Sequence, residues 1–263
     1  EMPATYSKFR RHAEKWSTIP ALPAPKNIPP PPKVVSKKGK TLSSFIAEHS
    51  TTENLLTGGE AAAQTHLSQY FAGDLPLSYK VVRNELDGFV NSSKMSSWLN
   101  MGCLSVRRLR MRIQDYEAER GGNDSTYWLF IELLWREYFL WLALQTKSKL
   151  FNFQGSAAQP PSTVYQREKF ESWCQADTPY SLVNACMFQL NETGYLSNRG
   201  RQIAASCLIN ELGQDWRFGA AWFENQLVDY NVAVNWGNWQ YIAGVGADPR
   251  GGRHFNLSKQ TEL

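Results

Sequence analysis

The chain has 263 residues, of which 42% are hydrophobic and 13% aromatic, including ten tryptophans. This length and composition favour a globular protein with one large core or two small ones, and they exclude a chain that is disordered throughout. The formal net charge is only +4. Because the positive charge is concentrated near the N-terminus, the chain carries a basic arm and is not a basic domain.

The first forty residues form this arm. They hold nine Lys or Arg against two Glu, and seven of the thirteen prolines lie between Pro20 and Pro32. Thr5–Trp16 is a candidate short helix, whereas the prolines predict an extended linker over residues 18–40. We therefore divide the chain into a basic, Pro-rich arm (1–40), which is a candidate site for a protein partner, and a helical domain (41–263).

The rest of the chain is predicted to be all-α. After residue 58 apolar residues recur with a period of about 3.6 residues, and few stretches alternate as half-buried strands do. The longest predicted helix, from Asp124 or Ser125 to about Lys149, is hydrophobic on nearly every face and is therefore central to the domain. The other predicted helices are Glu60–Phe71, a helix from Ser105 through Tyr116, Tyr180–Leu190, Asn198–Leu212 and Trp216–Asp229.

The four cysteines are predicted to be reduced core residues. All lie in apolar patterns without CxxC spacing, so we expect neither a disulfide framework nor a metal site. They are Cys103, Cys174, Cys186 and Cys207. The most apolar stretch, Trp128–Leu144, carries Glu132, Arg136 and Glu137 near its middle, so we expect it not to span a membrane.

A cluster of Asn and Ser residues, Asn91–Ser97, precedes the apolar run that begins at Trp98. Free N–H groups at a helix start, together with serine hydroxyls and Lys94, make a natural cradle for phosphate groups. The alternative interpretation is that the serines only cap a helix, as such clusters commonly do.

Charged residues also lie inside the most apolar predicted helix. Glu132 and Arg136 are four residues apart, so an ion pair along one helix face is the simpler interpretation. An acidic side chain in so apolar a helix is costly unless it lines a cavity. The neighbouring Trp135 suits a cavity wall at least as well as the core.

Between residues 198 and 254, glycines, acids and indoles interrupt ordinary helix patterning. The NWGNW motif (235–239) places two Asn and two Trp around one Gly, which predicts a wall around a flat, polar-edged ligand. Asn235 is placed to hydrogen-bond a ring edge. Trp216 and Trp239 are either core residues or stepping stones for an electron.

The same segment holds two further sets of charged residues. Arg201 and Asp229 are predicted to pair across two helices. Arg250 and Arg253 lie in a Gly-flanked basic loop, which is either solvated or contacts a phosphate backbone.

Together these segments resemble the FAD-binding helical domain of the cryptochrome/photolyase family, specifically its cryptochrome-DASH branch. The resemblance covers about residues 58–263. Its most specific motifs are GGE (58–60), YKVVRN (79–84), SSKMSSWL (92–99), STYWLFIELLWREYF (125–139), TGYLSNRGRQIAAS (193–206) and DWRFGAAWFENQLVDYNVAVNWGNWQYIAGVGADPRGGRHFN (215–256).

The resemblance implies FAD as the cofactor, with the following residue roles. The FAD-binding positions fall on Tyr79, Ser92, Ser93, Lys94, Met95, Ser96, Arg136, Arg201, Asp229, Asn231 and Asn235. The catalytic positions fall on Glu132, Trp135 and Asn235, of which Asn235 faces the flavin ring, and the electron-transfer positions fall on Trp216 and Trp239. The DNA- or lesion-contacting positions fall on Arg83, Glu132, Trp135, Asn198, Arg199, Gln202 and Tyr241.

The implied function is blue-light photoreception, light-driven repair of cyclobutane pyrimidine dimers in single-stranded DNA, or both. The expected partner is single-stranded DNA or RNA, with no membrane involved, and a flipped lesion suits a single strand because unstacking costs less there. No segment matches the family's N-terminal α/β antenna domain, so we expect neither that domain nor its chromophore. Because the first residue is Glu1, we expect the chain to be a fragment or a processed product.

Several positions depart from the family pattern. Asn184 and Phe188 replace the Asp and Arg of VDAxMREL, Asn231 replaces an Asp beside the flavin ring, and the outermost tryptophan of the electron relay falls on Thr163. These departures leave a further interpretation open, in which the fold is retained as a structural or interaction module without photochemistry.

Overall fold

The computed structural model describes residues 2–3, 5–17, 19–30, 56–246 and 251–261, and it is built from helices. The only pairing of extended backbone in these described residues is an isolated parallel bridge between Val164 and Gln214. The prediction of an all-α fold is therefore confirmed. The helices are α1 (Tyr6–Ala13), α3 (Glu60–Tyr70), α4 (Leu75–Val82), η2 (Phe89–Asn91), α5 (Ser96–Asn100), α6 (Val106–Arg120), α7 (Asp124–Thr146), η3 (Lys147–Phe151), α8 (Arg167–Cys174), α9 (Ser181–Thr193), α10 (Asn198–Ser206), η4 (Cys207–Glu211), α11 (Trp216–Gln226), α12 (Val232–Ala243) and α13 (Leu257–Thr261).

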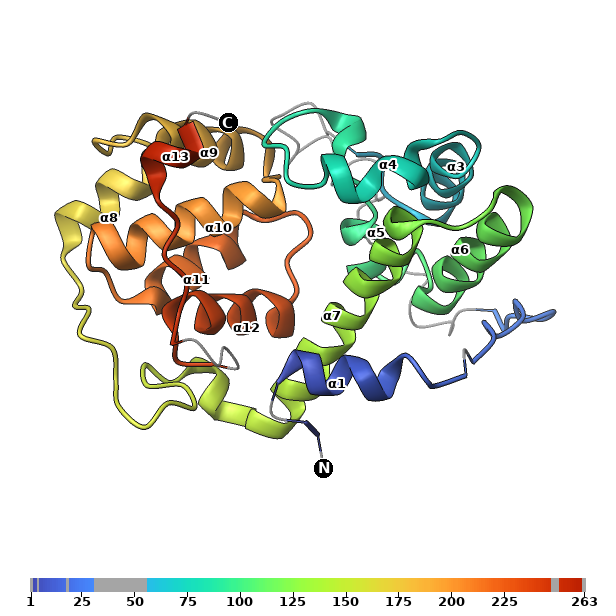
Figure 1. The fold of residues 1–263 in the computed structure, drawn as a ribbon, viewed down its shortest axis with the longest axis horizontal. Coiled ribbons are helices and arrows are strands. Elements are labelled where there is room, and N and C mark those ends of the chain that lie inside the picture. Colours follow the sequence, from blue (N-terminus) through green and yellow to red (C-terminus); the bar gives the residue numbers. More distant parts are fainter. Residues whose placement is uncertain (1, 4, 18, 31–55, 247–250, 262–263) are drawn as a thin grey trace.

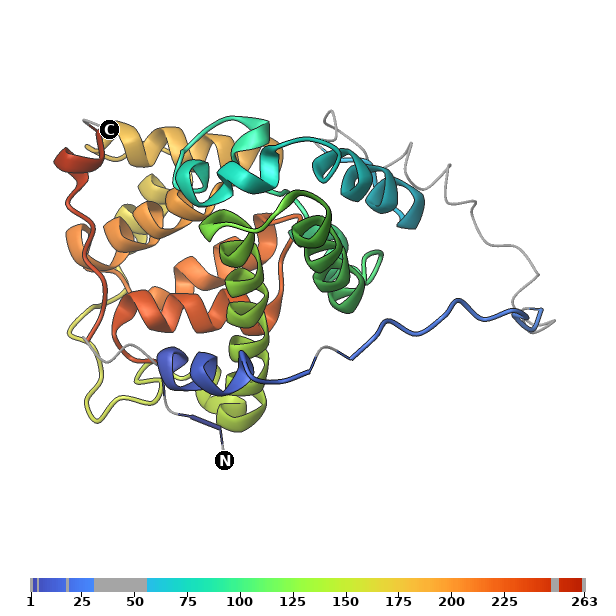
Figure 2. The same ribbon diagram turned by 45° about the vertical axis from the view of Figure 1, so that its right-hand side comes forward.

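Helix α7 lies between two groups of helices, α3–α6 on one side and α8–α13 on the other (Figure 1 and Figure 2). It packs against α1, α4, α6 and α12, so its predicted central position is confirmed. The helix is capped by Asn123, whose side chain accepts hydrogen bonds from the N–H groups of Ser125 and Thr126. The predicted cap at Asp124 or Ser125 is wrong because Asn123 reaches both of these free N–H groups.

Three clusters of buried side chains hold the helices together. The largest joins α8–α12 and contains Trp173, Trp216 and Trp239. The second joins α3–α6 to the start of α7. The third places Tyr6 and Phe9 of α1 against α7, so the short helix predicted near the N-terminus forms and is packed. The predicted boundary between residues 40 and 41 lies outside the described residues.

The NWGNW motif lies inside the continuous helix α12, although its residues predicted interrupted helix patterning. A Cβ atom on Gly237 would lie 2.4 Å from Cδ1 of Phe139, so the glycine admits the aromatic ring of α7 and not a ligand. The Asn235 amide donates to the carbonyl of Ala220 in α11, at 2.9 Å. The sequence of α12 lacks a simple amphipathic pattern because the helix is buried by α7 on one side and by α11 on another.

All four cysteines are free thiols, as predicted. Cys174, Cys186 and Cys207 are buried in the largest cluster, whereas Cys103 is half-buried beside the second cluster. Within the described ranges, no helix combines the length and the apolar character needed to cross a bilayer.

Candidate functional site

A cavity of about 730 Å³ opens between the two helix groups, with α7 along one side. This volume lies within the range of small-molecule and cofactor sites, about 300–1,000 Å³. Among the described residues, every site residue predicted from the sequence lines the cavity except Asn235, Trp216 and Trp239. Residues that are more than one hundred positions apart in the chain therefore meet in one space.

The loop before α5 supplies the polar end of the cavity. Ser92, Ser93 and Ser96 line it, but no side chain caps α5, so the interpretation of the serines as simple caps is wrong. His66 of α3 supports the loop, with its Nε2 atom 2.8 Å from the carbonyl oxygen of Ser93. The backbone then turns at Lys94, which adopts a φ of 54°.

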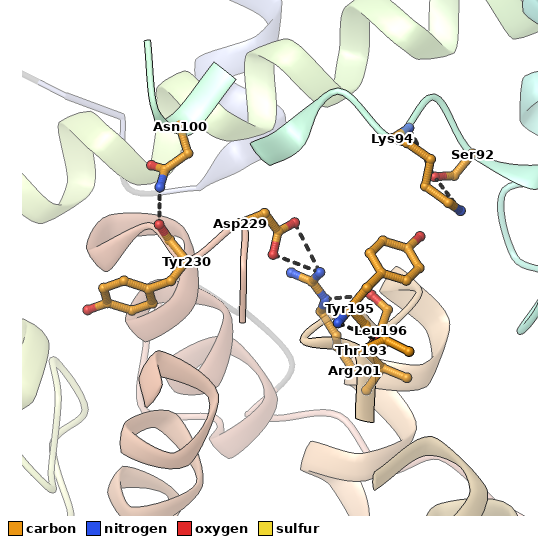
Figure 3. Close-up of polar contacts among 9 residues, drawn as sticks. All are labelled: Ser92, Lys94, Asn100, Thr193, Tyr195, Leu196, Arg201, Asp229 and Tyr230. Atoms are coloured by element: carbon orange, nitrogen blue, oxygen red, sulfur yellow. Dashed lines mark hydrogen bonds and ion pairs between the residues drawn. The ribbon is translucent and has the colours of Figure 1, made fainter. Parts of the chain in front are cut away.

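Lys94 brings a buried positive charge to this end of the cavity. Its residue is only 6% exposed, and its ammonium group lies 4.5 Å from the ring centre of Tyr195 (Figure 3). The nearest oxygens are those of Gly88 and Ser92, at 3.5 and 3.4 Å, and no carboxylate among the described residues pairs with it. A buried charge is costly without a partner, so this end of the cavity is suited to an anionic ligand.

Arg201 and Asp229 form the predicted ion pair on the opposite wall, as Figure 3 shows. One guanidinium nitrogen lies 2.9 and 3.0 Å from the two carboxylate oxygens. Arg201 Nε also donates to the carbonyl of Leu196, at 2.8 Å. The Asp229 side chain is 5% exposed and that of Arg201 is 25% exposed, so the pair is a fixed part of the wall.

Two asparagines connect the two walls. The Asn231 side chain donates from Nδ2 to Oδ1 of Asn100, at 2.8 Å, and accepts from the N–H of Val234 at the start of α12. Asn100 in turn donates to the carbonyl of Tyr230 (Figure 3). The departure from the family's Asp at position 231 therefore coincides with a link between α5 and α12, which sequence analysis did not predict.

Glu132 lies at the other end of the cavity and is held by residues of α4 and α7. Its Oε1 atom is 2.5 Å from Arg83 Nη2 and accepts from Trp128 Nε1 at 3.1 Å. Arg136 pairs instead with Glu137, at 3.2 Å. The predicted Glu132–Arg136 pair is wrong because Arg83 reaches Glu132 from a neighbouring helix. Burial raises the pKa of Glu132, and the charge of Arg83 opposes this rise.

Further aromatic and basic side chains line the same cavity. Trp135 is half-buried, and the edge of its ring faces Tyr241, with 6.1 Å between ring centres. Arg199 lies over Phe255 at 5.3 Å, and burial together with the positive charge of Arg83 lowers the pKa of Arg199. The remaining predicted contact residues, Asn198 and Gln202, also line the cavity.

Arg253 completes the basic surface of the cavity. It donates to the hydroxyl of Tyr241, and its guanidinium lies 5.0 Å from that ring centre. Arg250, the other arginine of the predicted basic loop, lies outside the described residues. The lining side chains that sequence reasoning missed include Tyr195, Asn100 and Asn238. Asn238 lies one helical turn after Val234 in α12, and both line the cavity. This helical spacing is the only sequence signal that could have indicated Asn238.

The predicted electron-transfer residues lie behind the cavity wall. Trp239 packs edge-on to Trp173, with 6.2 Å between ring centres, and Trp216 packs edge-on to Trp236, at 5.8 Å. Asn235 is also behind the wall, with its amide turned to α11. The roles predicted for Asn235, Trp216 and Trp239 remain predictions.

Position 163 is occupied by a side chain without aromatic character. The Thr163 hydroxyl is buried and has no hydrogen-bond partner in the described structure. Nearby, Tyr165 is exposed and stacks on Phe218, with 4.0 Å between ring centres.

Comparison with known proteins gives consistent matches. The family profile described as the FAD binding domain of DNA photolyase matches residues 128–263. The chain is 51% identical to a cryptochrome DASH of Vibrio parahaemolyticus, covering 100% of this chain and 58% of that protein. It is 40% identical to the chloroplastic/mitochondrial cryptochrome DASH of Arabidopsis thaliana, covering 100% of this chain and 47% of that one.

Solved structures give the same result. The chain superposes on a Synechocystis cryptochrome with a TM-score of 0.85 and 40% identity, covering 100% of this chain and 56% of that chain. A class III photolyase of Agrobacterium tumefaciens gives a TM-score of 0.77 and 28% identity, covering 99% of this chain and 55% of that one. The chain thus spans between about half and three-fifths of the length of these four proteins.

Proposed function

The chain belongs to the cryptochrome/photolyase family of FAD-binding flavoproteins, and from this premise we propose that it carries out light-driven repair of cyclobutane pyrimidine dimers in single-stranded DNA. The observation that carries the proposal is the single cavity. Its anion-binding end at Lys94 and its aromatic, basic end at Trp135 are parts of one continuous space.

The residues at the Lys94 end fit FAD. The pyrophosphate would meet the Lys94 ammonium and the hydroxyls of Ser92 and Ser96, which supply charge and hydrogen bonds. The Arg201–Asp229 pair would lie beside the flavin ring and fix its polar edge. When bound, FAD supplies the photochemistry, since it absorbs light and exchanges electrons.

The residues at the other end fit a flipped pyrimidine dimer. Trp135 offers an aromatic face for stacking, and base–aromatic stacking tolerates any base sequence. Arg83, Arg199 and Arg253 gather positive charge that attracts the phosphate backbone. Because burial raises the pKa of Glu132, this carboxyl keeps a proton more readily than an exposed one and is suited to donate a hydrogen bond to a pyrimidine carbonyl.

The test uses the full chain, purified with FAD. An oligonucleotide with one thymine dimer is illuminated with blue light in the presence of reductant, and the restored thymines are measured by chromatography. We expect restoration in a single strand, less in a duplex and none in the dark. A flavin-containing protein that leaves dimers intact would refute repair and support photoreception. A folded, colourless protein that cannot be loaded with FAD would instead indicate a structural module.

A further inference from the structure

Helix α1 of the basic arm packs directly behind the aromatic end of the cavity. The ring of Tyr6 lies parallel to the indole of Trp135, with 3.5 Å between ring centres and 9° between ring planes. Tyr6 is buried and does not line the cavity, whereas Trp135 is half-buried and does. Tyr6 therefore touches the indole from outside the cavity.

A hydrogen bond fixes Tyr6 to the helix that carries Trp135. The Tyr6 hydroxyl donates to the carbonyl of Ile131 at 3.1 Å, one turn before Trp135 in α7. Burial raises the pKa of Tyr6 above its usual value, so the hydroxyl keeps the proton that it donates. The two aromatic rings are thus held in register by a polar contact as well as by stacking.

Three other rings also contact the indole of Trp135. Tyr138 meets it edge-on at 5.9 Å and Tyr241 meets it edge-on at 6.1 Å, whereas Phe139 stacks on it at 5.6 Å with 25° between ring planes. Among the ring contacts of Trp135 in the described residues, Tyr6 is the closest and the most nearly parallel. Loss of Tyr6 would allow the indole to rotate into the vacated space.

We propose that Tyr6 is a positioning residue that sets the plane in which Trp135 meets a nucleobase. This inference rests on the proposed function, because it assigns the partner of Trp135 to a flipped pyrimidine dimer in single-stranded DNA. Under this proposal, α1 supports the recognition site, although it lies within the segment predicted to be a basic arm. The chemical class recognised is a flipped pyrimidine dimer presented from a single strand.

The experiment compares three variants of the full, FAD-loaded chain. Tyr6→Leu removes the stacking ring, Tyr6→Phe keeps the ring and loses the hydroxyl, and Phe9→Leu removes a buried ring of α1 that contacts Tyr138 and not Trp135. Flavin absorbance, thermal unfolding, and affinity for single-stranded oligonucleotides with and without one thymine dimer are measured for each.

We expect Tyr6→Leu to weaken binding of the dimer-containing strand by about threefold to tenfold, part of the effect of one stacked base. Its affinity for the undamaged strand and its flavin content should stay at wild-type values. Tyr6→Phe should bind the dimer within about twofold of wild type, because the ring remains. Phe9→Leu should lower the unfolding temperature to a similar extent and leave dimer affinity unchanged.

Two results would overturn the inference. The first is an unchanged dimer affinity in Tyr6→Leu, and the second is an equal loss of affinity in Phe9→Leu. If the wild-type chain does not prefer the dimer-containing strand, the proposed function fails. A double-mutant cycle of unfolding with Tyr6→Leu and Trp135→Leu then decides the positioning claim by itself. A measurable coupling upholds the contact, and additive effects refute it.

Discussion

The two walls of the cavity are built in different ways. The wall formed by α10 and α12 is part of the largest buried cluster. Behind it, Gly219 of α11 lies against Trp239 of α12. The facing wall is the loop around Ser92–Ser96, which ends in a helix of five residues and exposes Phe89 and Val90. The first wall is fixed by the core, whereas the second contributes charge and hydrogen-bonding groups.

This difference predicts separate consequences for mutation. Changes in the helical wall should lower the stability of the fold, because each side chain there is also a packing residue. Changes in the loop wall should alter ligand affinity and leave the fold intact. The following experiments test whether stability and binding divide between the walls in this way.

The largest effect is expected from Arg201→Gln in the helical wall. The substitution leaves the Asp229 carboxylate buried without its cation, and breaking a buried pair in this way costs about 3–5 kcal/mol of unfolding free energy. Urea denaturation measures the loss. The control is Glu171→Gln, which breaks an exposed pair with Arg167 and should change the stability far less. Equal stability of both variants would contradict the division between the walls.

Gly219→Ala should produce the next largest loss of stability. An added Cβ would lie 2.3 Å from Cη2 of Trp239 and 2.4 Å from Cδ2 of Leu208. We expect a net destabilisation of about 2 kcal/mol, since overpacking outweighs the gain in helix propensity of about 1 kcal/mol. Gly73→Ala, where a Cβ meets no atom within 4 Å, is the control in the same denaturation experiment. A stabilised Gly219→Ala protein would show that α11 and α12 are not rigidly packed.

Lys94→Met tests the loop wall. We expect FAD affinity to fall about tenfold or more, because a charge-assisted hydrogen bond to a phosphate is lost. The FAD-free protein should be as stable as wild type or more stable, since a buried charge without a carboxylate is removed. Quenching of flavin fluorescence measures the affinity. Lys80→Met, which removes an exposed partner of Asp124, should leave the affinity unchanged, and a loss of fold in Lys94→Met would refute the prediction.

A smaller effect is expected from pH at Glu132. Burial raises its pKa above the ordinary value of 4.5, so the folded state binds a proton more tightly than the unfolded state does. Its contribution to stability is therefore present below pH 4.5 and is lost as the pH rises through the folded-state pKa. Unfolding temperatures of wild type and Glu132→Gln are measured from acidic to neutral pH. The two curves should converge at acidic pH and diverge as the pH rises. Parallel curves would contradict the prediction.

The smallest perturbation is expected from thiol labelling, which compares how readily the two groups of helices open. Burial raises the pKa of Cys186 to about 11 and that of Cys174 and Cys207 to about 12, so these thiols stay protonated at about pH 8 and react slowly. Cys103, half-buried in the other half of the molecule, should react first with iodoacetamide. Mass spectrometry before and after adding urea identifies the labelled residues. Early labelling of Cys207 would show that the helical wall opens.

Sequence periodicity predicted the amphipathic helices, whose apolar residues lie on one face. Helix α6 buries Leu109, Ile113 and Tyr116 as its spacing indicates, and α3 ends within one residue of its prediction. Helix α12 was obscured because Gly237 and Asn235 serve packing against Phe139 and Ala220. Because these contacts are made with residues far away in the sequence, local sequence patterns cannot predict them.

The family resemblance predicted many of the polar residues that line the cavity, including Lys94 and the Arg201–Asp229 pair. It did not predict the links that depend on side-chain direction. Tyr6 and Trp135 are 129 positions apart, and their stacking follows from how α1 lies on α7. In the same way, Glu132 pairs with Arg83 and not with Arg136. Helix spacing alone cannot decide between these two partners.

The Asn100–Asn231 link makes two positions of the chain dependent on each other. Both polar atoms of each amide are occupied, and each contact joins one donor to one acceptor. An aspartate at position 231 would set an acceptor against the Asn100 oxygen. Asn100 would then have to turn its amide and release the carbonyl of Tyr230. Substitutions at positions 100 and 231 are therefore expected to occur together during evolution, so restoring the family's aspartate requires a second change in α5.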